Sequence, residues 1–317
     1  MNALIAAFAL APVLAFAQAY PVKTVKIIAP VQPGGGVDLV GRTVAGELTK
    51  SMGQSFVVEN LSGGGGVIAA QTVAKAAPDG YTLMVGYVAT HGTNPAVRKV
   101  PYDAVKDFTP IAMVGGTPNV LVVNPAVPVK TLAELVDYGK KNAGKLSYGS
   151  AGQGSLTPLA MEQFKQAAGL EATHAAYRGI GPAITDILGG QTQMMMPGLA
   201  AGIPHIRAGK LRPLAVTGPG RHALLPDVPT FEELGFKGFD GVQWYGIVGP
   251  AKMPEAVTAR LNDEINKALA APALRERLAG EALEPMPMTS LEFGRFIQAD
   301  ITRWSQLARD RKISLED

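Results

Sequence analysis

The sequence contains no cysteine, and that absence excludes three kinds of chemistry at once. Disulfide bonds, thiol nucleophiles and cysteine-ligated metals all require the thiol. An excess of charge is absent too, because the net charge is only +3 and the Lys and Arg residues are scattered along the chain. Since proteins that bind nucleic acid concentrate positive charge in a patch, we predict no nucleic-acid partner.

Long apolar runs are scarce, and beyond residue 19 none is long and apolar enough to span a bilayer. The first 19 residues are almost entirely apolar and end in Ala17-Gln18-Ala19, an A-x-A cleavage pattern. No Lys or Arg precedes them, so the usual positive region of a signal peptide is missing. We predict a signal peptide over residues 1–19, cleaved after Ala19, and hence a periplasmic protein. A buried helix or an anchor is the alternative.

The common catalytic patterns are also missing. No G-x-S-x-G nucleophile elbow occurs, and no Lys-Ser/Thr pair follows a glycine run as in a P-loop. The four histidines are widely spaced, with no H-x-x-x-H pair to favour a metal site. We therefore predict no catalytic residue, no metal and no cofactor. The histidines are His91, His174, His205 and His222.

Short strands and helices alternate along the chain, and this order is typical of an α/β fold with helices on the faces of a sheet. With 317 residues, 47% of them hydrophobic, the chain is long enough for two domains. The same order is seen twice, before and after residue 119. The expected strands are 25–28, 56–59, 81–85, 120–123, 146–149, 194–196, 211–216 and 244–248, and the expected helices include 39–52, 67–77, 131–141, 254–270, 272–278 and 290–311. The helix at 131–141 opens with the capping-box spacing of Thr131 and Glu134, and the run of three methionines at 194–196 is most simply a core strand, with an apolar binding face as the alternative.

Two glycine-rich turns join a strand to a helix, at residues 29–38 and again at 149–155. Glycines let the backbone approach a ligand closely, and the first amides of a helix are unpaired donors at its positive end. Such a turn can bind a carboxylate or phosphate, although a plain connection explains the first turn equally well. Two halves that face each other through these turns would enclose a small anion.

The remaining candidates are single side chains. Ser150 and Ser155 suit helix caps or hydrogen bonds to a ligand. His91 lies in a loop beside a predicted strand end. Trp244 and Tyr245 fit either a core or a pocket wall.

The chain as a whole resembles the periplasmic solute receptors of tripartite tricarboxylate transporters, of the Bordetella uptake gene product type. No one segment is specific, but together they occur in order and at matching spacing over nearly all of the chain. They are 20–21, 30–38, 57–60, 78–83, 94–95, 101–103, 107–108, 148–152, 225–230 and the Trp244 segment.

The resemblance implies a periplasmic-binding-protein-like fold of type II, with two doubly wound α/β domains that close on a small organic carboxylate. Carried over, the two turns place seven residues around that carboxylate: Pro33, Gly34, Gly35, Asp38, Ser150, Gly152 and Ser155. Three further residues, His91, Tyr177 and Trp244, complete the expected ligand-binding set.

Two departures from the family pattern concern ligand specificity. Residues 174–179 read His-Ala-Ala-Tyr-Arg-Gly where relatives commonly carry His-Val-Pro-Tyr-Lys-Gly. Pro197 stands where relatives often have an aspartate. Losing an acidic group near the pocket favours a ligand without an amino group, such as a di- or aromatic carboxylate.

The predicted organisation is a signal peptide (1–19), domain I (20–118 with 230–285), domain II (119–229) and a C-terminal helical segment (286–317). Hinge crossings are expected near 118–120 and 226–230. The predicted function is that of a monomeric, non-enzymatic receptor that hands a carboxylate to membrane permease subunits. A sensor for a signalling kinase and a secreted hydrolase are the alternatives.

Overall fold

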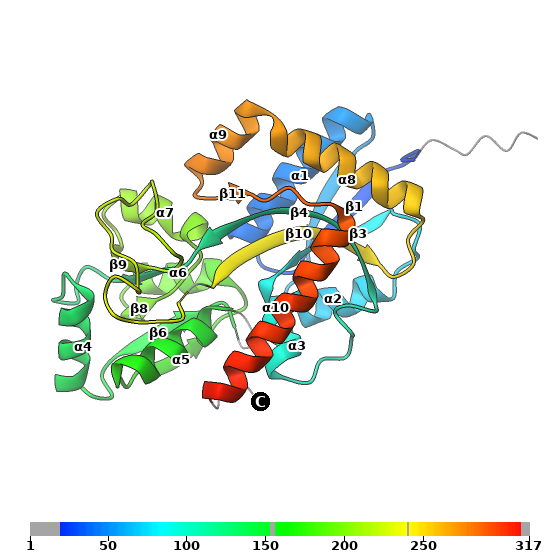
Figure 1. Ribbon diagram of the computed structural model, residues 1–317. Coiled ribbons are helices and arrows are strands. Elements are labelled where there is room, and N and C mark those ends of the chain that lie inside the picture. Colours follow the sequence, from blue (N-terminus) through cyan, green and yellow to red (C-terminus); the bar gives the residue numbers. More distant parts are fainter. Residues whose placement is uncertain (1–19, 153–155, 240, 312–317) are drawn as a thin grey trace, which may run out of the picture.

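The computed structural model describes residues 20–152, 156–239 and 241–311, and it folds into two sheets with helices on their faces (Figure 1). The predicted signal peptide and Ser155 lie outside these residues. The strands are β1 Val25–Ala29, β2 Phe56–Asn60, β3 Thr82–Tyr87, β4 Phe108–Pro118, β5 Val120–Val123, β6 Ser147–Ser150, β7 Thr173–Ala176, β8 Met194–Met195, β9 Arg212–Val216, β10 Val242–Pro250 and β11 Glu284–Pro285. The α-helices are α1 Gly36–Met52, α2 Val67–Ala74, α3 Asn94–Val97, α4 Leu132–Lys141, α5 Leu156–Ala168, α6 Ile180–Leu188, α7 Leu199–Arg207, α8 Glu255–Ala270, α9 Pro272–Gly280 and α10 Ser290–Arg311. Two short helices, the 3₁₀ turn η1 Gly64–Gly66 and the π-helical turn η2 Ala89–Thr93, complete the order.

The first sheet has six strands in the order β11-β4-β10-β3-β1-β2. β1 runs parallel to β2 and β3, whereas β10 is antiparallel to both β3 and β4. Figure 1 shows α1, α8 and α9 on one side of this sheet and α2, α3 and α10 on the other. The helices shield a large apolar core around this sheet.

The second sheet has five strands in the order β7-β6-β8-β5-β9. Successive side chains of a strand point to opposite faces, and two separate cores follow from that alternation. Met194 and Met196 join the core under α4 and α5, while Met195 joins the core under α6 and α7. The run of three methionines therefore contributes side chains to the cores on both faces of the sheet.

The chain passes between the two sheets at two places. It leaves the six-stranded sheet at Pro118 and enters the five-stranded sheet at Val120. It returns at Val242, where β10 begins, and not near residues 226–230 as the sequence predicted. The reason is that Phe231 and Phe239 stack on each other inside the core of the five-stranded half.

The two crossings are tied together by hydrogen bonds. The backbone N–H of Asn119 donates to the Thr217 hydroxyl at 2.8 Å, and that hydroxyl donates to the Gly241 carbonyl at 2.9 Å. The Thr217 N–H donates in turn to the Asn119 carbonyl at 2.8 Å. The two crossings thus lie side by side.

In the part of the chain that the structure describes, no helix is both long enough and apolar enough to cross a membrane. Nor do the described residues gather three acidic or histidine side chains where they could hold a metal ion.

Candidate functional site

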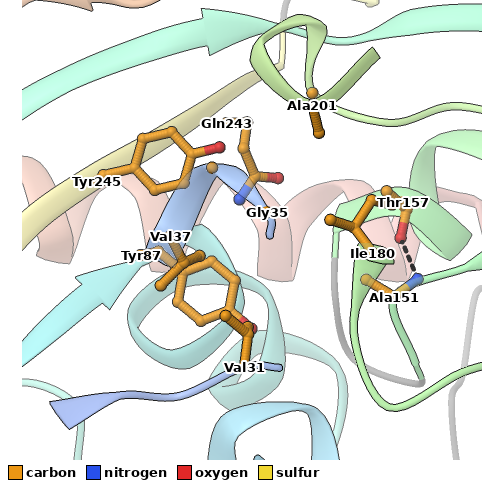
Figure 2. Close-up of a pocket in the computed structure, with 12 residues that line it drawn as sticks. Val31, Gly35, Val37, Tyr87, Ala151, Thr157, Ile180, Ala201, Gln243 and Tyr245 are labelled. Carbon is orange, nitrogen blue, oxygen red and sulfur yellow. Dashed lines mark hydrogen bonds between the residues drawn. The ribbon is translucent and has the colours of Figure 1, made fainter. Parts of the chain in front are cut away.

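A cavity of about 40 Å³ lies between the two halves, and both halves contribute to its wall (Figure 2). In the described parts of the chain, the side chains that line it are apolar or uncharged, and none is acidic or basic. The six-stranded half contributes Val31, Gly35, Gly36, Val37, Tyr87, Gln243 and Tyr245, and the five-stranded half contributes Ala151, Thr157, Ile180, Gly198 and Ala201.

The first glycine-rich turn is held by Asp38 and places Gly35 in the cavity wall. The Asp38 carboxylate accepts hydrogen bonds from the Gly34 N–H at 3.2 Å, from Arg42 at 3.0 Å and from Asn60 at 2.9 Å. Burial would raise the pKa of Asp38, but these three donors outweigh it and lower the pKa. Asp38 is therefore an ionised brace of the turn, and Gly34 adopts a positive φ of 93° beside it.

The second turn follows β6 and is braced by hydroxyl groups. The Ser150 hydroxyl lies 2.6 Å from His174 Nε2 and accepts the Gly152 N–H at 3.2 Å. The Thr157 hydroxyl accepts the Ala151 N–H at 3.0 Å and holds Ala151 in the cavity wall (Figure 2). Because Ser150 is fully buried and its oxygen accepts a backbone bond, this Ser–His pair shapes the turn. It does not present an exposed nucleophile.

Three helices begin at the cavity. Gly35 precedes α1, Gly179 precedes α6 and Gly198 precedes α7, and no side chain caps any of the three helices. One amide of α7 is taken, since the Ala200 N–H donates to Thr117 at 3.2 Å. Uncapped helix starts supply N–H donors and positive partial charge, so the cavity can stabilise an anion without a cationic side chain.

The first glycine-rich turn contacts the start of α6, and glycines at this contact let the two halves approach closely. A methyl group at Gly35 would lie 2.6 Å from Ile180, and one at Gly181 would lie 3.2 Å from the Pro33 carbonyl. Any residue larger than glycine would therefore separate the two surfaces. The described conformation is closed around the cavity.

One wall of the cavity is polar, and sequence reasoning offered only one of its residues, Tyr245, as a possible pocket wall. Tyr87, Gln243 and Tyr245 are between 3% and 8% exposed and face the cavity. Alternation along β10 could have paired Gln243 with Tyr245, because residues i and i+2 share a face of a strand. The sequence alone does not tell which face of β10 meets the other half.

The structure brings only part of the predicted set together. Gly35 lines the cavity, and Gly34 and Asp38 lie beside it in an adjoining groove of about 370 Å³ between α1, α7 and α9. Pro33 is exposed at the closing contact. Ser150 and Gly152 build the second turn, just behind Ala151.

Tyr177 follows β7 and does not line the cavity. Its hydroxyl donates to Asp186 at 2.7 Å. Its carbonyl lies close to Gly152, where a methyl group would approach it to 2.8 Å. Tyr177 therefore supports the second turn from outside.

His91 and Trp244 lie away from the cavity. His91 is fully buried, with Nδ1 2.9 Å from the Thr90 hydroxyl and its ring edge against Phe108. Trp244 sits on the opposite face of β10 from Gln243 and donates to Asp300 of α10 at 2.7 Å. Both are packed into the six-stranded half, because each points away from the facing half.

Two mixed sheets joined by a double crossing, with a cavity between them at helix starts, define a periplasmic-binding-protein-like receptor. Solved structures support that class. A structure described as R. palustris Rpa4515 with adipate superimposes with a TM-score of 0.90 at 34% identity, over 93% of this chain and 99% of that one. MatC (Rpa3494) from Rhodopseudomonas palustris with bound malate gives a TM-score of 0.87 at 33% identity, over 91% and 99%.

The chain belongs to the family of tripartite tricarboxylate transporter receptors. The sequence model of that family matches residues 40–313. Protein BugT of Bordetella pertussis is 34% identical over 303 residues, which cover 95% of this chain and 93% of BugT. The resemblance found in the sequence is thereby confirmed. The family is one of solute receptors and not of enzymes.

Proposed function

We propose that this protein binds a small organic carboxylate without an amino group in the cavity between its halves, and delivers it to a tripartite tricarboxylate-type membrane transporter from the periplasm. The observation that carries the proposal is the meeting of three uncapped helix starts at one closed cavity. A carboxylate there would accept backbone N–H bonds from both halves, and so would favour closure. Adipate and malate, present in the structures of Rpa4515 and MatC, are carboxylates of the proposed kind.

The absence of an amino group follows from the wall of the cavity. Among the described residues that line it there is no Asp or Glu, and Pro197 precedes the start of α7. A buried ammonium group without a carboxylate partner is costly. An amino acid should therefore bind more weakly than its deaminated counterpart.

Closure supplies the signal for the membrane partner. A permease that recognises the closed form would engage only the loaded receptor. A sensor kinase could recognise the same form, and the genes that neighbour this one would distinguish the two partners.

The first test is binding by the mature chain from Tyr20 onward. Isothermal titration and thermal shift with succinate, malate, adipate and benzoate should reveal at least one ligand, and aspartate should bind at least tenfold more weakly than succinate. A ligand at a hundred times its dissociation constant adds about 2.7 kcal/mol of stability. Binding of aspartate in preference to succinate would contradict the proposed ligand class.

A cavity-filling variant locates the site. Ala201 lines the cavity, so Ala201→Leu should abolish binding. Ala279→Leu, on the exposed surface of α9, is the matched control and should bind as the parent does. Equal affinity in the two variants would place the ligand elsewhere.

A further inference from the structure

The polar wall of the cavity has hydrogen-bonding groups that bind nothing else in the described residues. No hydrogen bond to the Gln243 amide or to the hydroxyls of Tyr87 and Tyr245 is found there, although each residue is at least nine-tenths buried. By contrast, Tyr102 and Tyr148, which are also buried, donate to Thr90 and Glu162. The polar groups of buried residues are normally paired, whereas these three residues line the cavity, so their polar groups are available to a ligand there.

The three groups surround one end of the cavity. Figure 2 shows the Gln243 amide and the Tyr245 hydroxyl directed into the space between the halves, with Tyr87 below them beside Val31 and Val37. The Tyr245 hydroxyl lies against Gly36, at the first residue of α1, where a methyl group would overlap it. Burial raises the pKa values of both tyrosines, so both phenols stay neutral donors.

Gln243 also contacts the five-stranded half. Its side chain lies against Gly198, where a methyl group would be 3.3 Å from Gln243 Cγ, and its backbone pairs with Thr117 at the crossing between the sheets. A group bonded to Gln243 is therefore enclosed by the start of α7. Contact with this amide and closure of the halves occur together.

We infer that Gln243, with Tyr87 and Tyr245, determines specificity by binding an uncharged hydroxyl or carbonyl group on the carboxylate ligand. The inference rests on the proposed function. An amide offers both a donor and an acceptor, and a hydroxyl pairs with both at once. A ligand without that group leaves a buried amide unpaired on closure, and such sites reject the deficient analogue.

Matched acids test the inference. Malate differs from succinate, and 3-hydroxybutyrate from butyrate, by one hydroxyl group. Titration of the mature protein should show each hydroxy acid binding about tenfold tighter than its partner. In Gln243→Leu the two acids of each pair should bind within about twofold of each other, because the amide that pairs with the hydroxyl group and is left unpaired by the plain acid is gone.

Two further variants refine the test. Tyr245→Phe removes only a hydroxyl and should reduce the advantage in part. Tyr138→Phe, on α4 outside the cavity, should leave it unchanged. Melting curves without ligand show whether each variant is folded.

The outcomes separate this inference from the function on which it rests. Binding of the acids with no hydroxyl preference, or a preference that survives in folded Gln243→Leu, would refute the role of Gln243 and leave the receptor function standing. Failure of every acid to bind would refute both.

Discussion

The two halves of the receptor contribute to the cavity by different means. The six-stranded half places buried polar side chains there, from Tyr87, Gln243 and Tyr245, whereas the five-stranded half contributes small or apolar residues and the starts of α6 and α7. Under the proposed function, the first half would distinguish ligands by side-chain chemistry. The second half would close over them with its backbone.

The halves also differ in how deeply their histidines are buried. We expect this difference to have the largest effect of all, on the stability of the protein at acid pH. His91 is fully buried in the six-stranded half, with no partner at Nε2, and burial lowers its pKa to about 3. His174 in the five-stranded half is partly buried and bonded to Ser150. The unfolded chain binds a proton at His91 near pH 6.5, while the folded chain does not until about pH 3. Stability must therefore fall as pH falls through that window, by about 1.4 kcal/mol per pH unit.

Urea unfolding at several pH values between 7 and 4 measures this loss. His91→Gln cannot take up the proton and should show a shallower decline than the parent. Burial lowers the pKa of His222 as well, but this residue is partly exposed, so His222→Gln should follow the parent's decline more closely than His91→Gln does. A parent protein whose stability is level over this range would contradict the assignment.

The next largest effect is expected at Gly36, which lies against Tyr245 of the polar wall. A methyl group in Gly36→Ala would push the Tyr245 ring into the cavity, so carboxylate affinity should fall about 100-fold, or about 2.7 kcal/mol. Gly46→Ala lies on the same helix with open space around it and should keep its affinity, with about 1 kcal/mol of added stability. Calorimetric titration compares the two, and equal affinities would show that Tyr245 does not border the ligand.

The smallest effect concerns the closing surface of the five-stranded half. Gly181→Ala would crowd the Pro33 carbonyl and destabilise the closed form, weakening binding about threefold to tenfold. Gly189→Ala, at the other end of α6, meets only ordinary contacts and should bind normally. Small-angle scattering with saturating ligand would show whether Gly181→Ala stays more open. Identical affinity and shape in the two variants would exclude a role for this contact in closure.

The sequence predicted local structure well where the local signal was complete. The Thr131–Glu134 spacing predicted a capped helix start, and the Glu134 N–H does donate to the Thr131 hydroxyl at 3.1 Å. The methionine run was predicted as a core strand, and all three side chains are buried. Both features depend only on neighbours in the chain.

The sequence did not predict equally well which distant segments pack together in the tertiary structure. Nothing local says that Phe231 and Phe239 fill the five-stranded half, so the return crossing was expected too early. From the sequence, Trp244 and Tyr245 fitted either a core or a pocket wall. Because side chains alternate along β10, Trp244 packs against α10 and Tyr245 faces the cavity. The other two residues of the polar wall, Tyr87 and Gln243, were missed because the wall combines β3 with β10, which are far apart in the sequence.

The indole of Trp244 has one further consequence. The chain has only two tryptophans, and they flank the same crossing. Trp244 follows Gln243 on β10, and Trp304 of α10 lies 3.2 Å from where a methyl group at Gly241 would stand. All of the intrinsic indole emission of this protein therefore originates beside the double crossing, so a movement of the two halves about that crossing would change a signal that the native chain supplies without an added dye.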